Sequence, residues 1–232
     1  MKKLIIFIIS LITVNLAKAG DDNSLHFGLK ITPSLAWLRT DTKGLESNGS
    51  KFGFSYGLIT EFRFSDHYSF ATGIDVAYRG GNLRSTSEST DAVGTKTVIV
   101  ADSKTTLQYI EIPLTLKLKT SEIGYLTYYL QAGVSPGFNI RARADNKTNT
   151  QTTFSNNTTT NVNTEETGVD IQKDINAVNL SMIIGGGVEY TLSGSTVLLV
   201  GIQFNNGLFD VLDASSAKAN SNYLGLSIGI LF

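Results

Sequence analysis

Apolar residues recur at every second position over long stretches of this 232-residue chain. Between residues 52 and 64, for example, phenylalanine, tyrosine and leucine fall on even positions, while most odd positions carry glycine, serine or charged residues. A period of two is that of a β-strand with one apolar and one polar face. Eight such segments follow one another, so the sequence predicts an all-β fold. The predicted strands comprise residues 25–38, 52–64, 67–79, 105–119, 124–141, 175–190, 195–207 and 221–232.

The strands and their connections have the lengths of a membrane barrel. Strands of soluble proteins usually have about 5 or 6 residues, whereas a tilted strand needs about 9 to 11 residues to cross a bilayer. Connections after the second, fourth and sixth strands are tight, and the others are long and polar, over roughly residues 39–51, 80–104, 142–174 and 210–219. Short turns on one side and long loops on the other are typical of barrels with both termini in the periplasm. We therefore predict an eight-stranded antiparallel up-and-down transmembrane β-barrel, whereas a lipocalin-type soluble barrel would turn its apolar face inward.

Both ends of the chain indicate export to the outer membrane. Residues 1–19 have the basic start, the short apolar core and the Ala17-Lys18-Ala19 pattern of a signal peptide cleaved after Ala19, leaving a barrel domain at 20–232. The last strand ends on a C-terminal phenylalanine, which outer-membrane barrels present to their assembly machinery. The predicted assembly signal comprises Tyr223, Leu224, Leu226, Ile228, Ile230 and Phe232.

Composition narrows the range of functions. Without Lys2, Lys3 and Lys18, 16 basic residues face 20 acidic ones, so nucleic acid is not an expected partner. The chain has no cysteine, and both histidines, His26 and His67, fall at the predicted periplasmic end. We therefore expect no disulfide, no metal, no cofactor, no catalytic residues and no enzymatic activity.

The polar face of the strands defines the candidate site. Because charges are costly in hydrocarbon, the apolar face meets lipid and the polar face lines the lumen. The predicted lumen residues are Lys30, Glu61, Arg63, Asp75, Glu111, Lys117, Gln131, Glu189 and Gln203. The simplest interpretation is a polar network that fills the barrel, because buried charges must pair. In the alternative, Asp75 and Glu111 line a narrow path for water or cations.

Two further features lie in the fourth strand and in the loops. Pro113 cannot donate a ladder hydrogen bond, so we expect a local bulge there. Residues 146–167 form a Thr/Asn-rich tract that we expect to be a mobile loop, with docking of an extracellular partner as the functional alternative. Residues 95–100 have strand character and could extend a hairpin above the membrane.

The whole pattern, and especially Tyr109-Ile-Glu-Ile-Pro-Leu114, resembles the PorT-like outer-membrane β-barrel family common in Bacteroidetes. The resemblance covers residues 25–232 and implies a small OmpA/OmpX-like barrel. The family is named after a member associated with protein secretion. We predict a structural or interaction role through long extracellular loops, with a small-solute channel or an accessory part of a secretion assembly as alternatives. The expected partners are outer-membrane lipid including lipopolysaccharide, the assembly machinery, and an extracellular or secretion-system protein.

Overall fold

The computed structural model describes residues 25–213 and 217–232, and the predicted signal peptide lies outside them. Eight strands form a ring, one of them interrupted at Pro113 and so divided into β5 and β6. No helix in this part of the chain is long and apolar enough to cross a membrane. The ring consists of β1 (Leu25–Arg39), β3 (Lys51–Ser65), β4 (Tyr68–Thr90), β5 (Lys96–Glu111) with β6 (Leu114–Lys119), β7 (Leu126–Thr153), β9 (Val178–Ser193), β10 (Thr196–Gly207) and β11 (Asn220–Leu231).

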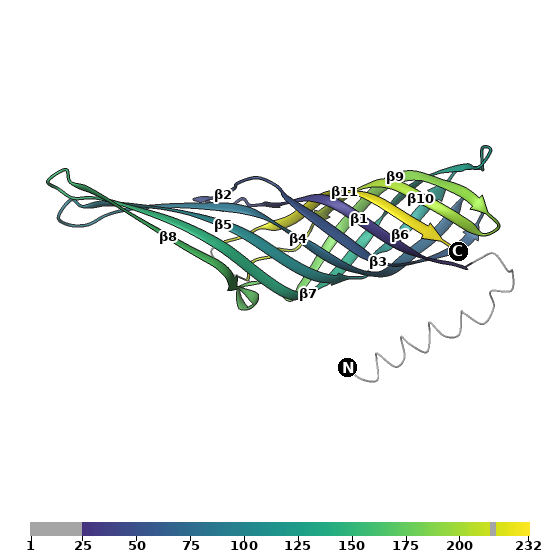
Figure 1. Cartoon of the computed structure of the whole chain (residues 1–232), viewed down its shortest axis with the longest axis horizontal. Coiled ribbons are helices and arrows are strands. Elements are labelled where there is room, and N and C mark those ends of the chain that lie inside the picture. Colours follow the sequence, from purple (N-terminus) through teal and green to yellow (C-terminus); the bar gives the residue numbers. More distant parts are fainter. Residues whose placement is uncertain (1–24, 214–216) are drawn as a thin grey trace, which may run out of the picture.

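Each barrel strand is antiparallel to its neighbours, and the first strand closes the ring on the last. β1 pairs with β11 from Gly28↔Leu231 to Arg39↔Asn220, and β4 pairs with both β5 and β6. Figure 1 shows the resulting barrel, with the C-terminus and the short turns at one end. The predicted all-β, eight-stranded antiparallel barrel is confirmed.

The outer surface of the barrel is apolar, as the alternation predicts. Along β1, Phe27, Leu29 and Ile31 are exposed, while His26 and Thr32 are buried in the lumen. Five tyrosines of the barrel strands are exposed on this outer surface, and Trp37 stacks on Phe204 with ring centroids 6.3 Å apart. These tyrosines are Tyr56, Tyr68, Tyr78, Tyr128 and Tyr190.

The prediction of a bulge at Pro113 is wrong. The register of β5 and β6 against β7 is the same on both sides of the proline, since Glu111 pairs with Gly137 and Leu114 with Val134. Proline removes only one donor, so the ladder is interrupted without insertion of a residue. The bulge lies further along the barrel wall, where Gln108 pairs with Arg141 but the next residue of β5 pairs with Asn139.

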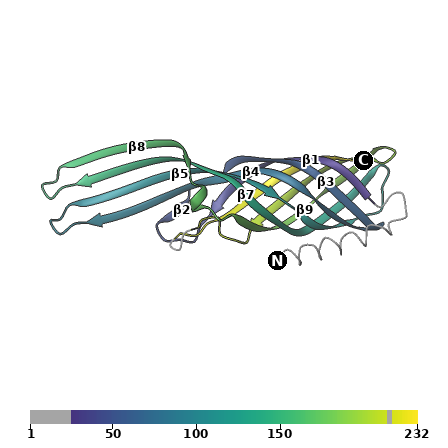
Figure 2. The same cartoon turned by 90° about the horizontal axis from the view of Figure 1, so that it is seen from below.

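The prediction of a mobile loop at residues 146–167 is also wrong. β4, β5 and β7 continue far beyond the lipid-facing band. β8 (Thr159–Asp170) returns along β7 with pairs from Thr153↔Thr159 to Arg143↔Asp170. Figure 2 shows these strands as a sheet that projects from the barrel. A Thr/Asn tract cannot fold alone, but here rigid neighbouring strands offer partners for its backbone, and threonine favours strands. The expected extension at residues 95–100 is confirmed, because β5 begins at Lys96.

The two faces of this projecting sheet differ in charge. On one face Arg84, Asp102, Lys147 and Glu165 form a row across four strands. Arg84 Nε lies 2.7 Å from Asp102 Oδ1, and Lys147 Nζ lies 2.9 Å from Glu165 Oε1. The opposite face, which we call the hydroxyl face, has three uncharged rows. They are Ser85, Ala101, Thr148 and Thr164; Ser87, Ile99, Thr150 and Val162; and Ser89, Thr97, Thr152 and Thr160.

We expect acid to weaken the hairpin of β4 and β5. The hydrogen bond from Arg84 lowers the pKa of Asp102, and backbone N–H groups including that of Thr95 lower the pKa of Asp91 in the hairpin turn. A carboxylate whose folded pKa is depressed stabilises above its unfolded pKa of about 3.9, and this stabilisation is lost as pH falls through the folded pKa. Carboxyl carbon NMR titration of the folded protein should show both groups titrating below about 3.9.

In Arg84→Gln the midpoint for Asp102 should rise toward its unfolded value, while Asp91 should be unchanged. An Asp102 that titrates near about 3.9 in the unsubstituted protein would contradict the assignment.

Candidate functional site

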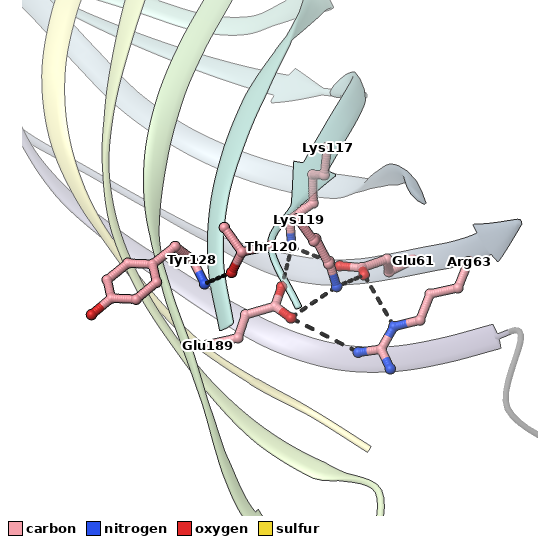
Figure 3. Close-up of polar contacts among 7 residues, drawn as sticks. All are labelled: Glu61, Arg63, Lys117, Lys119, Thr120, Tyr128 and Glu189. Atoms are coloured by element: carbon pink, nitrogen blue, oxygen red, sulfur yellow. Dashed lines mark hydrogen bonds and ion pairs between the residues drawn. The ribbon is translucent and has the colours of Figure 1, made fainter. Parts of the chain in front are cut away.

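A charge cluster of five residues lies in the lumen near the periplasmic end, and Figure 3 shows its contacts. Lys117 of β6 donates to Glu61 of β3 at 2.6 Å and to Glu189 of β9 at 2.5 Å. Lys119, two residues further along the same face, also pairs with Glu61 and lies 2.8 Å from Glu189. Arg63 Nε lies 3.4 Å from Glu61 Oε1, and its Nη2 lies 3.9 Å from Glu189 Oε2.

Opposite charges alternate within this cluster. The side chains of Lys117 and Glu61 are both 0% exposed, so neither charge is solvated by bulk water. Lys117 also lies 4.4 Å from the centre of the Tyr129 ring, where a cation is attracted to the aromatic face. Such buried charges are tolerated only when each finds well-placed partners. The cluster is therefore a packed polar plug, and below it a cavity of about 860 Å³ opens at the periplasmic mouth.

A second polar layer lies at mid-height. Lys30 Nζ is 2.8 Å from Asp75 Oδ2, and Arg79 Nη2 is 2.6 Å from Glu111 Oε2. The Arg79 guanidinium also lies 3.8 Å from the centre of the Tyr223 ring. Both carboxylates that were considered as lining an ion path are thus paired with cations.

Little space remains beside this layer. Tyr223 accepts a hydrogen bond from Gln203 at 2.5 Å, and Gln203 accepts one from Ser227 at 2.9 Å. A cavity of about 20 Å³ lies beside Lys30, Gln131 and Gln203. This volume holds about one water molecule.

Apolar side chains also fill parts of the lumen, which the sequence interpretation did not foresee. Near the periplasmic plug, Ile59, Tyr129, Val197, Leu199 and Leu231 form a buried cluster. Val197 and Leu199 are apolar residues at inward positions of β10. This break in the alternation is the sequence signal that indicates an apolar part of the lumen. At the extracellular mouth a larger cluster comprises Leu38, Leu83, Leu107, Tyr109, Ala142, Ile175 and Val211.

Two long loops hold this extracellular cap in place. Ile175 precedes β9, and Val211 follows β10. The backbone N–H of Asn176 donates to the Val211 carbonyl at 2.8 Å, and its side-chain amide donates to the carbonyls of Asp210 and Leu212 at 2.9 and 3.1 Å. The cap is therefore a hydrogen-bonded lid with an apolar underside.

The predicted lumen residues thus separate into layers. The structure brings Glu61, Arg63, Lys117 and Glu189 together and places Lys30, Asp75 and Glu111 above them, with Gln131 and Gln203 at mid-height. The predicted lumen residues did not include Lys119, Arg79 and Tyr223, which complete the two layers. These residues can be found from the sequence, because every second residue of β4, β6 and β11 faces the lumen.

The predicted C-terminal signal has two faces. Leu224, Leu226, Ile230 and Phe232 are exposed on the lipid side, whereas Tyr223 is buried in the lumen. The reason is parity, because odd positions from residue 223 to 231 face inward. Recognition of this strand by the assembly machinery stays a prediction.

The two histidines and the acidic side chains are the residues that bear on metal and catalytic chemistry. No group of three or more His, Asp or Glu side chains within residues 25–213 and 217–232 could hold a metal ion. His26 and His67 both line the periplasmic cavity. His26 is buried, and its Nδ1 has no hydrogen-bond partner that would orient the ring as a base.

Fold and lumen together define an outer-membrane β-barrel protein. The chain belongs to the family described as outer membrane protein beta-barrel domain, whose model matches residues 18–213. No curated protein matches the sequence.

Solved structures of small outer-membrane barrels are similar to this chain. Neisserial surface protein A is 15% identical over 89% of this chain and 97% of its own, with a TM-score of 0.40. OprG from Pseudomonas aeruginosa is 12% identical over 92% and 98%, with a TM-score of 0.41. Ail of Yersinia pestis, in complex with the heparin analogue sucrose octasulfate, is 11% identical over 89% and 99%, with a TM-score of 0.33.

Removal of Lys117 should destabilise the barrel strongly. In Lys117→Ala, Glu61 and Glu189 lose a shared cation inside the lumen, and breaking a buried pair in this way costs about 3 to 5 kcal/mol. Urea unfolding in lipid vesicles, followed by the heat-sensitive gel shift of the folded barrel, measures the change.

Lys96→Ala is the matched control, because Lys96 forms an exposed ion pair with Glu88 at 3.1 Å. Loss of such an exposed pair costs about 1 kcal/mol or less. Equal effects of the two substitutions would show that the cluster does not hold the lumen together.

Proposed function

We propose that this protein is a non-conducting outer-membrane barrel that presents its projecting sheet to an extracellular partner. The observation that carries the proposal is the filling of the lumen at three levels, by the periplasmic charge cluster, the mid-height ion pairs and the extracellular apolar cap. Eight strands enclose a space just wide enough for side chains. A barrel filled in this way serves as an anchor, so the surface that can act is outside the membrane.

The hydroxyl face and the β8 edge support an interaction role. Val162 is 59% exposed and Ile99 37% exposed among threonines and serines, so the face offers small methyl and hydroxyl groups without charge. β8 is paired with β7 alone, which leaves its outer edge open to an added strand. A partner with an uncharged, polar surface fits this face.

The remaining parts of the proposal concern biogenesis and affiliation. The protein is exported by cleavage after Ala19, and its last strand is recognised by the assembly machinery. The resemblance carried by residues 109–114 supports a place among PorT-like barrels of Bacteroidetes, where the sheet would dock an extracellular or secretion-system protein. The role is non-enzymatic, and the barrel wall contacts outer-membrane lipid including lipopolysaccharide.

We expect the folded protein to be silent in a planar lipid bilayer. Because the mid-height carboxylates are paired with cations and apolar side chains cover the extracellular mouth, we expect no continuous water path and no conductance steps. The measurement uses only material with the heat-sensitive gel shift, and a porin serves as positive control. Reproducible steps that disappear in Asp75→Asn or Glu111→Gln would instead establish the narrow channel.

A charge placed on the hydroxyl face should weaken partner binding. Thr150 lies in the middle row of that face, and the adjacent Gln151 points to the opposite face. Thr150→Lys should therefore reduce self-aggregation of cells that display the protein, or their attachment to polysaccharide-coated plates, because an uncharged contact must desolvate the ammonium.

Gln151→Lys adds the same charge to the same strand and should leave both assays unchanged. Folding and surface display are checked for each variant by the gel shift and by whole-cell antibody binding. If wild-type cells behave like cells without the protein in both assays, this surface has no such role.

A further inference from the structure

The bulge in β7 places two consecutive side chains on the outside of the barrel. Ile140 has no partner in β5, because Gln108 pairs with Arg141 and Tyr109 with Asn139. Ile140 and Arg141 are both exposed, Ala142 returns to the lumen, and Arg143 is exposed again. Without the bulge, both arginines would face the lumen and the alanines the outside. Bulges often redirect a side chain in this way.

The two arginines lie where the lipid-facing surface ends. Below them on the same outer face, Val134, Phe138 and Ile140 are exposed apolar residues. Above them the strand enters the polar sheet. On β1 the outward series likewise passes from Leu35 and Trp37 to an arginine, Arg39. The height of Arg141 and Arg143 is thus that of the outer-leaflet headgroups, which border the apolar band.

Two lysines join the arginines. Arg143 is directly opposite Thr106 of β5, and Lys104 is the next outward residue on that strand. Lys51 reaches the same place, because its ammonium donates to Thr106 Oγ1 and to the Thr105 carbonyl. We call Lys51, Lys104, Arg141 and Arg143 the rim patch.

The cations of the rim patch do not form ion pairs within the described residues. None of the four forms a salt bridge with any carboxylate in the described part of the chain. Two acids lie directly opposite patch cations, Asp145 opposite Lys104 and Asp170 opposite Arg143, and both carboxylates accept backbone hydrogen bonds. Asp145 accepts from the N–H of Gly168 at 2.8 Å, and Asp170 accepts from the N–H of Gln172 at 2.9 Å. Four cations against two acids leave the patch positive.

We propose that the rim patch binds the phosphate groups of an outer-leaflet lipid, of the phosphorylated glycolipid type. Arginine holds phosphate through two parallel hydrogen bonds. Successive outward residues of a strand are about 7 Å apart, so Arg141 and Arg143 can reach one headgroup together. Lipid fits better than a soluble anion, because Phe138 and Ile140 lie directly below and offer an apolar surface to acyl chains. The proposal needs only the position of the barrel in the outer membrane and is independent of any partner on the hydroxyl face.

The test measures binding of lipopolysaccharide to the full mature chain, refolded in nanodiscs of neutral phospholipid. Titration with lipopolysaccharide, followed by native mass spectrometry, gives the affinity. The double substitution Arg141→Gln and Arg143→Gln should weaken lipid binding about tenfold or more. The reason is that each cation near an anionic lipid surface strengthens binding severalfold. Lipopolysaccharide from which the lipid phosphates have been removed should bind the unsubstituted protein as weakly.

Lys96→Gln with Lys147→Gln is the matched control. It also removes two cations from β5 and β7, but these are paired with Glu88 and Glu165 beyond the membrane. Binding should be unchanged in this control and largely retained in Arg141→Lys with Arg143→Lys. Full binding by the double glutamine variant, or equal binding of dephosphorylated lipid, would overturn the proposal. Displacement of the lipid by millimolar inorganic phosphate would show a site for free phosphate and would overturn it as well.

Discussion

Closure of the ring by β1 and β11 is the interaction on which the rest of the structure depends. In hydrocarbon no water can pair with a free backbone group, and each unsatisfied group costs several kcal/mol. A sheet in lipid must therefore have no edge, and the ladder from Gly28↔Leu231 to Arg39↔Asn220 removes the last one. The strand that contains Pro113 also meets this constraint. At Pro113 one donor is missing, but the register continues, so the wall is interrupted and not opened.

Closure with eight strands also decides what the lumen contains. Eight strands enclose a space just wide enough for side chains, so the inward side chains pack against one another. Glu61, Lys117 and Glu189 do so by alternating charge, and Val197 with Leu199 by apolar contact. Beyond the membrane the constraint disappears, because water can pair with free backbone groups. There the sheet leaves the ring and keeps an open edge at β8, which a membrane segment could not have.

The sequence predicts the periodic part of this structure and misses the parts that depend on neighbours. Alternation fixes the strands, their order and their two faces, because the period of two is a property of each strand alone. The mobile loop expected at residues 146–167 is instead a hairpin, since its stability comes from pairing with β5 and β7. No local sequence signal marks the bulge at Ile140. Pro113 is such a signal, but no bulge forms there. Parity places Arg79 and Tyr223 in the lumen, but it does not say that they meet there, because their contact joins strands far apart in the chain.

The positions of the bulges show how one strand can serve three environments. The register shifts in the ladders lie at the rims of the barrel or beyond them. Two lie near the periplasm, between Arg63 and Ser65 and at Thr196. Two lie on the extracellular side, at Ile140 and near Asp145. A bulge leaves one residue unpaired and increases the local twist, which is costly in hydrocarbon and tolerated where water begins. Along β7, the shift at Ile140 ends the lipid-facing series and turns cations outward. The shift near Asp145, with Gly168 at a φ of 67°, then redirects the strand pair into the projecting sheet. The backbone bulges thus mark the membrane boundary, as the change from apolar to charged side chains does.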